Sequence, residues 1–243
     1  GALVSGLTGG MGAGKSVVSQ ILRSLGLPVF DADAEARKLY DADATLLQSV
    51  SDRFGSAVLE PDGSLNRSEL ASVVFNDAEA LADLNAMVHP AVTRAFASWK
   101  AQAENSGAVL VFREAAILFE SESAVDCDVI WAVTAPLATR VQRVQQRNGW
   151  SEAEIQRRMA HQWPADQIHA RSDQVIVNDG SQALVPLVLS HETEPALPES
   201  VNFVFEMHAP TAQLSVLVTV QSCASGGSER MVTRRICPAC ATP

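Results

Sequence analysis

The chain has 243 residues, 47% of them hydrophobic and 19% charged, which is typical of a globular protein with a full core. Its formal net charge of −10 argues against a general binder of nucleic acids or anionic membranes, because both need a basic surface. No apolar stretch reaches the ~20 residues that cross a bilayer and no secretion signal is recognisable, so we expect a cytoplasmic protein without membrane or nucleic-acid partners.

The first chemical motif is GGMGAGKS at residues 9–16, which matches G-x-x-x-x-G-K-[ST], the loop that holds the phosphates of ATP or GTP. An apolar run at residues 2–7 precedes it as an expected strand, and apolar residues at helical spacing follow it as far as residues 26–28. Glycines let successive N–H groups turn inward around an anion, and the helix directs its positive end at the phosphates. The sequence therefore predicts a nucleoside triphosphate site.

Two side chains give this loop its chemistry. Lys15 is expected to reach the β- and γ-phosphates, and the Ser16 hydroxyl is expected to bind Mg²⁺. A GTPase would also need the guanine-reading sequence N-K-x-D, which the chain lacks, so we predict ATP and Mg²⁺ as the cofactors. The residues expected to contact the nucleotide here are Gly10, Met11, Gly12, Ala13, Gly14, Lys15, Ser16 and Val17.

Two carboxylates follow the second expected strand, residues 28–30. Asp31 and Asp33 come directly after it, at the carboxyl edge of the sheet, where open α/β sheets bind ligands. In a phosphoryl-transfer enzyme such a carboxylate accepts the proton of the attacking hydroxyl. The alternative is that the two residues cap the N-terminus of a helix, where Asp is favoured. From spacing, both interpretations stay open.

Residues 34–100 have a helical pattern with a turn at residues 60–64, and they are too many for a simple connection between two strands. We interpret this insertion as a helical region on the substrate side. Its apolar face is broken at His89 and Pro90. His89 is either a packed residue at this helix break or a contact to the substrate.

The third expected strand, residues 108–112, leads to Arg113 and Glu114. Many phosphate-loop enzymes have a carboxylate at this position that helps to hold Mg²⁺. Glu114 is therefore a second candidate metal ligand. An ion pair between Arg113 and Glu114 is the alternative explanation.

A basic segment follows the fourth expected strand, residues 129–133. Arg140, Arg143 and Arg147 fall on one face of a helix. We interpret this stripe, with Arg157 and Arg158 beyond it, as a mobile lid that closes over the triphosphate, with Arg140 as the arginine expected to act on it. A solvated surface face is the usual alternative for such a run of charges.

Residues 151–154 have the capping-box pattern S-x-x-E and open a further expected helix, which runs through Gln162 to a break at residues 163–164. A fifth strand at residues 175–177 ends in the turn Asn178-Asp179-Gly180. Strands that alternate with helices and are continuously apolar predict a parallel sheet covered on both faces. The predicted fold class is α/β, with a parallel five-stranded sheet flanked by helices.

We expect one domain at residues 1–194 and an unassigned C-terminal tail at residues 195–243, for which disorder is one interpretation. The domain is divided into a core (1–30, 105–136 and 172–194), a helical substrate region (31–104) and an Arg-rich lid (137–171). The tail carries the side chains of a weak zinc pattern, for which free thiols are the alternative. These are Cys223, Cys237, Cys240 and His208.

The ordered set of motifs resembles that of dephospho-CoA kinases. GLTGGMGAGKS at residues 6–16 resembles that family's opening GLTGGIGSGKS, and residues 31–33 resemble its D-A-D segment. Further matches are L-N-x-x-x-H-P at 84–90, A-I-L-F-E at 116–120 for P-L-L-F-E, R-x-x-R-x-x-x-R at 140–147 and N-D-G at 178–180. The chain departs from the pattern at Ala116-Ile117, which replaces Pro-Leu, and at Val17, where the family often has Thr.

The resemblance implies a P-loop kinase that transfers the γ-phosphate of ATP to the ribose 3′-hydroxyl of dephospho-CoA, the last step of coenzyme A biosynthesis. It implies that Asp33, Lys15 and Arg140 are catalytic, with Asp33 as the base or hydroxyl-orienting group. Asn178 would lie near the adenine, and Asp31, Asp33 and His89 would contact the substrate.

Two other functions are compatible with the phosphate loop. The same loop would serve a kinase for another small acceptor, such as a nucleoside monophosphate or a sugar acid. A nucleotide-binding protein without turnover is a further alternative. We expect a monomer or a weak homo-oligomer.

Overall fold

The structure is a computed structural model that describes residues 1–75, 77–184, 188, 199–208, 213–223 and 229–236. The chain forms two compact units. One consists of Gly1–Phe30 together with the chain from Gln102 onward, and the other of Asp31–Ala101.

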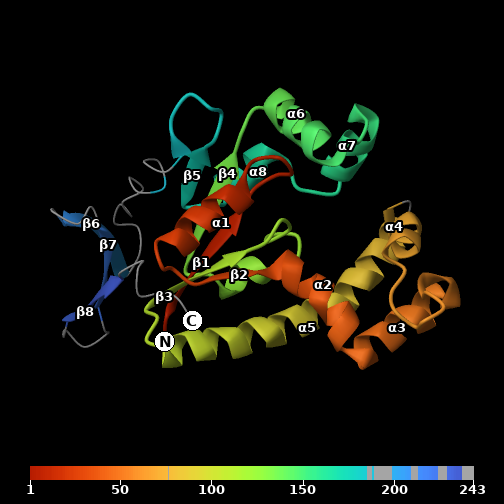
Figure 1. The fold of residues 1–243 in the computed structure, drawn as a ribbon, viewed down its shortest axis with the longest axis horizontal. Coiled ribbons are helices and arrows are strands. Elements are labelled where there is room, and N and C mark those ends of the chain that lie inside the picture. Colours follow the sequence, from red (N-terminus) through yellow and green to blue (C-terminus); the bar gives the residue numbers. More distant parts are fainter. Residues whose placement is uncertain (76, 185–187, 189–198, 209–212, 224–228, 237–243) are drawn as a thin grey trace. The chain divides into compact units, whose positions relative to one another are not determined.

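The first unit is built on a five-stranded sheet (Figure 1). Its strands lie in the spatial order β2-β3-β1-β4-β5, and β1 pairs in parallel with β3 and β4, as β4 does with β5. The prediction of an α/β fold with a parallel five-stranded sheet is therefore confirmed. The strand bounds are β1 (Leu3–Thr8), β2 (Val29–Asp31), β3 (Leu110–Glu114), β4 (Val129–Thr134) and β5 (Gln174–Val177).

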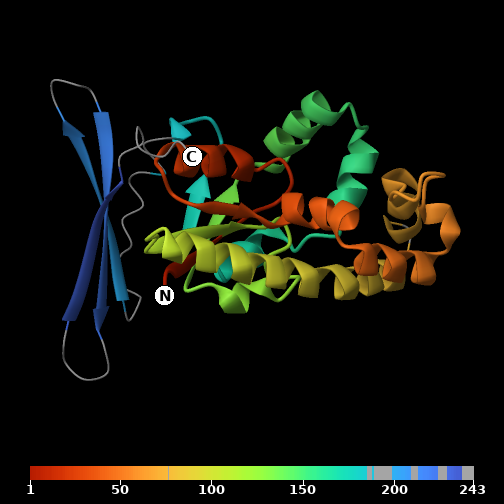
Figure 2. The ribbon, with the colours of Figure 1, turned by 60° about the horizontal axis from the view of Figure 1, so that its bottom comes forward.

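Successive side chains of a strand point to opposite faces of the sheet, and a different segment packs on each face. Helix α1 (Lys15–Ser24) covers one face, and the segment between β3 and β4, which contains the short helix η2 (Ser123–Asp126), covers the other (Figure 2). On the second face a Cβ added to Gly6 would lie 2.7 Å from Leu118 Cδ2. The buried cluster on the α1 face includes Leu7, Val18, Leu22, Phe112, Trp131, Val133 and Ile176.

A buried cation and a thiol lie under the second face. Arg113 is 1% exposed and donates hydrogen bonds to the Asp126 carboxylate at 3.1 Å and to the Ser123 hydroxyl at 3.0 Å. Cys127 is a free thiol beside Gly6. Burial raises the pKa of Cys127 to about 12, against the opposing effect of the Arg113 charge. This side of the core therefore holds its cysteine in the neutral form at physiological pH.

The second unit is helical. The predicted turn at residues 60–64 is present, since the Glu60 N–H donates to the Ser64 carbonyl at 2.8 Å and the Gly63 N–H to the Glu60 carbonyl at 2.9 Å. Among the described residues, no helix has both the length and the apolar composition that crossing a bilayer requires. The helices are α2 (Ala32–Ala42), α3 (Ala44–Phe54), η1 (Ser56–Val58), α4 (Arg67–Phe75) and α5 (Ala78–Asn105), the last residues of which belong to the first unit.

The predicted helix break at His89 and Pro90 is wrong. Helix α5 has 28 residues and continues through Pro90. A proline inside a helix removes one backbone hydrogen bond and costs about 3 kcal/mol. Buried residues on both sides of it, such as Val88 and Ala91, keep one apolar stripe packed, and this packing outweighs the local cost.

Three helices connect β4 to β5: α6 (Leu137–Asn148), α7 (Glu152–Met159) and α8 (Ala165–Ala170). The predicted cap of α7 is confirmed, because the Ser151 hydroxyl accepts a hydrogen bond from the Glu154 N–H at 3.2 Å. The predicted extension of this helix to Gln162 is wrong. The Gln162 N–H donates to the Met159 carbonyl at 3.0 Å, three residues earlier, so the chain leaves the α-helix in a tight turn.

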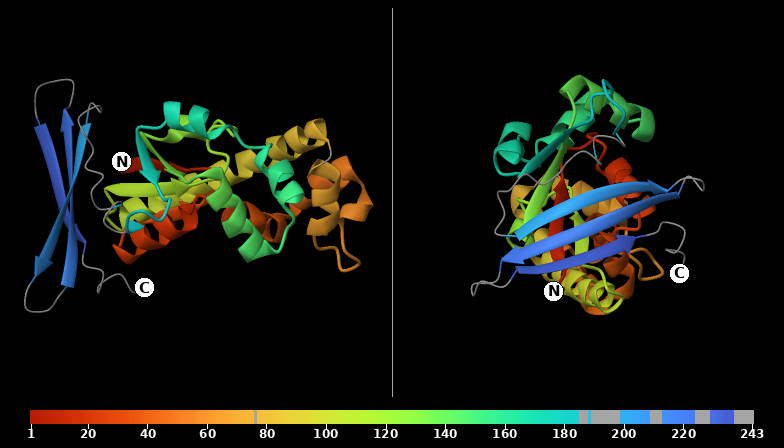
Figure 3. Two further views of the ribbon diagram at one scale, coloured as in Figure 1. Left: turned by 90° about the horizontal axis from the view of Figure 1, so that it is seen from above. Right: turned by 90° about the vertical axis from the view of Figure 1, so that its left-hand side faces the viewer.

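The C-terminal segment contains a separate antiparallel sheet in the order β6-β7-β8 (Figure 3). Its strands are β6 (Glu199–His208), β7 (Gln213–Cys223) and β8 (Glu229–Ile236). Disorder is one interpretation of this tail from the sequence, and its described residues form three strands. Two of the candidate zinc ligands, Cys237 and Cys240, lie outside the described residues, so the zinc alternative stays a prediction.

Leu7→Ala should lower the free energy of unfolding by ~2–5 kcal/mol, the range for truncating leucine in a packed core, because Leu7 is fully buried in the α1 face of the sheet. Leu137→Ala makes the same change at a residue that is 55% exposed, and its effect should stay within ~0.5 kcal/mol. Urea unfolding of both variants and the parent measures the difference. Equal losses would contradict the position of β1 at the centre of the core.

Candidate functional site

The phosphate loop joins β1 to α1, so the strand–loop–helix setting predicted from the sequence is confirmed. Three of its glycines have backbone conformations that other residues rarely adopt, with φ of 144° at Gly9, 78° at Gly12 and 103° at Gly14. At each of them an added Cβ would also collide with a neighbouring segment. Glycine is therefore required at these positions by conformation and by close packing alike.

Several carbonyl groups of the loop are held by hydrogen-bond donors. Lys15 Nζ donates to the Gly9 carbonyl at 2.7 Å, and the Ala13 N–H donates to the Gly10 carbonyl at 3.1 Å. With its carbonyl oxygens occupied in this way, the loop presents N–H groups to an anion. The Lys15 ammonium lies at the same loop, where an incoming phosphate would meet it.

Asn178 directly follows β5, as predicted, and its side-chain amide faces the phosphate loop. Its Nδ2 donates to the Ala13 carbonyl at 2.9 Å, and its backbone N–H donates to the Thr134 carbonyl at 2.7 Å. A Cβ on Gly14 would collide with the same amide nitrogen. Asn178 thus ties the loop to the ends of β4 and β5, and its expected place near the adenine remains a prediction.

The arginine stripe of α6 divides into different roles. Arg143 donates from Nη1 to the Gly12 carbonyl at 3.4 Å and from Nη2 to the Asn178 carbonyl at 3.0 Å, so it ties α6 to the loop. Arg147 is exposed, and its Nε donates to the adjacent Asn148 side chain at 2.8 Å. Of these two arginines, one therefore supports the loop and the other fits the alternative of a solvated surface face, whereas the closing of a lid over the triphosphate stays a prediction.

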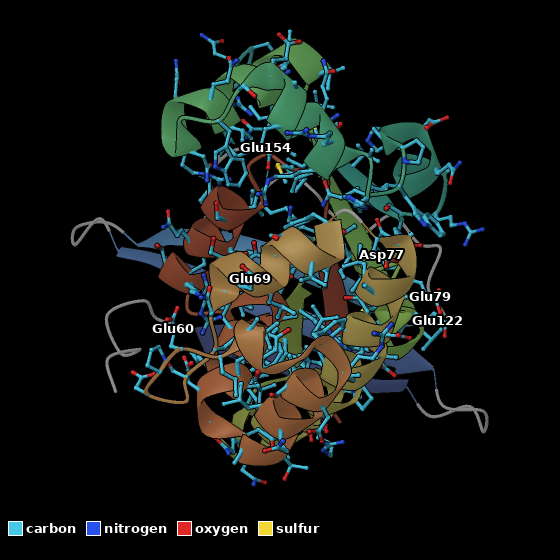
Figure 4. All side chains as sticks on the ribbon, turned by 90° about the vertical axis from the view of Figure 1, so that its right-hand side faces the viewer. Glu60, Glu69, Asp77, Glu79, Glu122 and Glu154 are labelled. Atoms are coloured by element: carbon cyan, nitrogen blue, oxygen red, sulfur yellow. The ribbon has the colours of Figure 1, made fainter. Side chains whose placement is uncertain are left out.

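Arg157 and Arg158 on α7 form ion pairs with a carboxylate of the same helix. Both bond to Glu154, at 2.5 Å from Arg157 Nη2 and at 2.6 Å from Arg158 Nε. Figure 4 labels Glu154 among the side chains. These hydrogen bonds lower the pKa of Glu154 below its ordinary value. Arg157 is exposed and fits the interpretation as a surface residue, whereas Arg158 is partly buried, with its guanidinium carbon 4.1 Å from the centroid of the Trp150 ring.

Arg140 of α6 also lies against the loop. A Cβ on Gly10 would collide with Arg140 Nη1, and one on Gly12 would collide with the Arg140 backbone. Burial lowers the pKa of this guanidinium, but arginine begins so far above neutrality that it stays charged. Its buried Nε has no hydrogen-bond partner among the described residues. A half-buried charge over the glycines of the loop is suited to an anionic ligand.

Gln162 also contacts the loop, and sequence reasoning gave it no role. Its Oε1 accepts a hydrogen bond from the Met11 N–H at 2.8 Å, and its Nε2 donates to the Ala116 carbonyl at 3.1 Å. The only hint in the sequence that Gln162 has such a role is its position directly before the helix break at Trp163-Pro164, where a chain that leaves a helix can direct a side chain inward. That signal does not identify the residue it would meet.

Glu114 is the last residue of β3 rather than a loop residue, and it is 7% exposed. The Ser19 hydroxyl of α1 donates to its Oε2 at 2.5 Å. Because Arg113 and Glu114 are adjacent in a strand, their side chains leave opposite faces, and the bonds found for each lie on those separate faces. The Glu114 side chain therefore lies on the face of the sheet that α1 covers. Ser16, which is exposed, belongs to the same helix.

The acceptor-side candidates lie in the second unit. Asp31 caps α2, since its carboxylate accepts a hydrogen bond from the Ala34 N–H at 2.8 Å. Asp33 lies in the first turn of α2 and His89 lies within α5, and both are partly buried. The alternative of a helix cap thus holds for Asp31, through one of its carboxylate oxygens. The roles expected of Asp33 and His89 stay predictions.

Comparison with known proteins gives a consistent result. The family model described as dephospho-CoA kinase matches residues 3–183. The curated dephospho-CoA kinase of Salinibacter ruber is 39% identical over 176 residues, which cover 72% of this chain and 88% of that protein. That of Geobacillus kaustophilus is 37% identical over 180 residues, covering 74% and 90%.

Solved structures agree with the fold. A Thermus thermophilus protein is 36% identical, with a TM-score of 0.66, and the match covers 76% of this chain and 92% of that one. The dephospho-CoA kinase from Campylobacter jejuni has a TM-score of 0.55 at 22% identity, covering 76% and 91%, and this likeness supports the fold alone.

Gly14→Ala should abolish nucleotide binding, because the new Cβ would be strained at φ 103° and would displace the Asn178 amide from the loop. Gly63→Ala is the matched control: its φ is 86°, nothing lies within 4 Å, and it should cost about 1 kcal/mol of stability while leaving nucleotide binding unchanged. Titration with a fluorescent ATP analogue compares the two. Tight binding by Gly14→Ala would show that the loop tolerates a side chain there.

Proposed function

The chain belongs to the dephospho-CoA kinase family, and from this premise we propose how its residues carry out the family's reaction. The enzyme is a phosphotransferase that uses ATP to phosphorylate the ribose 3′-hydroxyl of dephospho-CoA, which gives coenzyme A in the final step of its biosynthesis. The observation that carries the assignment is a family match over residues 3–183 that coincides with a built phosphate loop. The individual residue roles below are our proposal.

The donor half of the proposed site is the loop with Lys15 and Arg140. Those N–H groups of the segment Gly10–Val17 that are not bonded within the protein, together with the dipole of α1, bind the phosphates of ATP. Lys15 and Arg140 neutralise negative charge that builds up as the γ-phosphoryl group leaves. The support for Arg140 is its half-buried guanidinium over Gly10, and the support for Lys15 is its ammonium at the Gly9 carbonyl.

Asp33 is the proposed base or orienting group for the 3′-hydroxyl. Phosphoryl transfer needs the acceptor oxygen to be aligned and its proton to be taken up, and a carboxylate can do both. Asp33 is proposed from its place in the D-A-D segment of the family resemblance, while Asp31 caps α2 with one carboxylate oxygen. We assign Asp31 and His89 to substrate contacts and Asn178 to the adenine side of the nucleotide.

Mg²⁺ is the metal that we propose for this reaction. The Ser16 hydroxyl and the Glu114 carboxylate offer hard oxygen ligands, which Mg²⁺ prefers, so the residues present fit the ion. Bound with ATP, the ion would supply positive charge to the phosphate oxygens. Ser19 keeps the Glu114 carboxylate oriented through its hydroxyl.

The substrate of the family's reaction, dephospho-CoA, is a small molecule. The location of the enzyme, its oligomeric state and its lack of other partners are proposals. We propose a cytoplasmic enzyme that works as a monomer or a weak homo-oligomer without nucleic acid or membrane partners. The net charge of −10 and the absence of a membrane-spanning helix among the described residues support this assignment.

The full chain with Mg-ATP should convert dephospho-CoA to coenzyme A and should leave nucleoside monophosphates and gluconate unphosphorylated. Mass spectrometry of the product, with NMR to locate the new phosphate on the 3′-oxygen, checks both points. Phosphorylation of another acceptor in the absence of any coenzyme A would overturn the assignment.

Asp33→Asn should leave ATP binding nearly intact and lower kcat by roughly 10²–10⁴, the range for loss of a general base. Asp52→Asn is the matched control in the same unit, because Asp52 is an exposed residue of α3 that accepts a surface hydrogen bond from Gln48. Steady-state kinetics and ATP titration of both variants give the answer. A wild-type kcat in Asp33→Asn would exclude this residue as the base.

A further inference from the structure

We propose that Gln162 is a positioning residue that holds the phosphate loop in its binding shape before ATP arrives. Its side-chain amide bridges the Met11 N–H of the loop and the Ala116 carbonyl of the segment after β3. The consequence for kinase activity rests on the proposed function, whereas the effect on ATP binding does not. Gln162 touches no reacting group, so it acts through the loop.

The backbone at Gln162 is itself held on both sides of the residue. Its own N–H bonds to the Met159 carbonyl at 3.0 Å, and the next N–H, that of Trp163, donates to Glu120 Oε1 at 2.7 Å. The Trp163 ring stacks on Phe119 with centroids 5.6 Å apart and planes within 8°. A side chain whose backbone is anchored in this way loses little further entropy when it bonds to the loop.

The loop needs such a partner at Met11. Other bonds between the loop and distant segments have its carbonyls as acceptors: Asn178 and Arg143 donate to the carbonyls of Ala13 and Gly12. Gln162 instead accepts from a loop N–H, which a phosphate would otherwise compete for. This bond therefore selects which N–H groups remain for the anion.

The Met11 side chain reinforces the same connection. It packs, partly buried, against the cluster of Val141, Val144 and Ile155 that joins α6 to α7. Backbone and side chain of one loop residue are thus both attached to the α6–α8 segment. A loop that is ordered in this way before binding pays less entropy when it closes on the phosphates, and affinity rises accordingly.

The test compares Gln162→Met, which keeps the length of the side chain and removes both hydrogen bonds, with Gln156→Met. Gln156 lies exposed on α7, where its amide bonds to Glu152 at 3.0 Å. Gln162→Met should raise the Kd for ATP about five- to tenfold, the effect of one lost hydrogen bond, and should change kcat at saturating ATP less than about twofold. Gln156→Met should change neither value.

Selective ¹⁵N-methionine labelling gives a second readout, part of which comes from the parent protein alone. The chain has 5 methionines, so the Met11 amide is one of few signals and Met11→Leu assigns it. In the ATP-free parent this amide should exchange slowly with solvent; in Gln162→Met it should exchange fast until ATP is added.

Fast exchange of Met11 in the ATP-free parent would overturn the proposal, as would an unchanged Kd in Gln162→Met. A lower melting temperature with unchanged Kd and kcat would assign Gln162 a purely structural role. If the parent binds ATP but does not phosphorylate dephospho-CoA, the proposed function fails, and the ATP and exchange measurements still decide the role of Gln162.

Discussion

A loop that must bind an anion has to turn its N–H groups toward one point, and this requires other groups to occupy its carbonyls. In this protein some of these donors are local, Lys15 and the Ala13 N–H, and others come from distant parts of the chain. Asn178 after β5 and Arg143 of α6 each donate to a carbonyl of the phosphate loop, and Gln162 accepts from one of its N–H groups. The binding shape of the loop is therefore a property of the whole parallel sheet and its connections, not of the eight motif residues.

The parallel topology explains why those donors can reach the loop. Strands β1, β4 and β5 run side by side in the same direction, so the loop after β1 and the turn after β5 emerge at one edge of the sheet. Helix α6 begins at the same edge, directly after β4. Strand β3, the neighbour of β1 on the side away from β4, ends at the same edge with Glu114. The Glu114 carboxylate accepts a hydrogen bond from the Ser19 hydroxyl of α1. Charge and hydrogen-bonding groups thus converge at one edge of the sheet.

The sequence predicted the fold well because its strands are continuous apolar runs and its phosphate loop has fixed spacing. It failed where tertiary packing outweighs a local signal, as at Pro90, which the buried stripe of α5 carries through the helix. It also failed where a role depends on which residues meet in space. Arg143 and Arg147 share one helical face in the sequence pattern, yet one bonds to the loop and the other faces solvent, and nothing in the periodicity distinguishes them.

The state of Cys127 has a consequence for an enzyme whose substrate and product are both thiols. Thiol–disulfide exchange proceeds through the thiolate, and a cysteine with a pKa near its ordinary value would form mixed disulfides with oxidised forms of such ligands. Burial beneath the sheet raises the pKa of Cys127 to about 12, so its thiolate is scarce at physiological pH. Packing under Gly6 therefore makes this sulfur a poor partner for covalent capture of the very molecules that the protein handles.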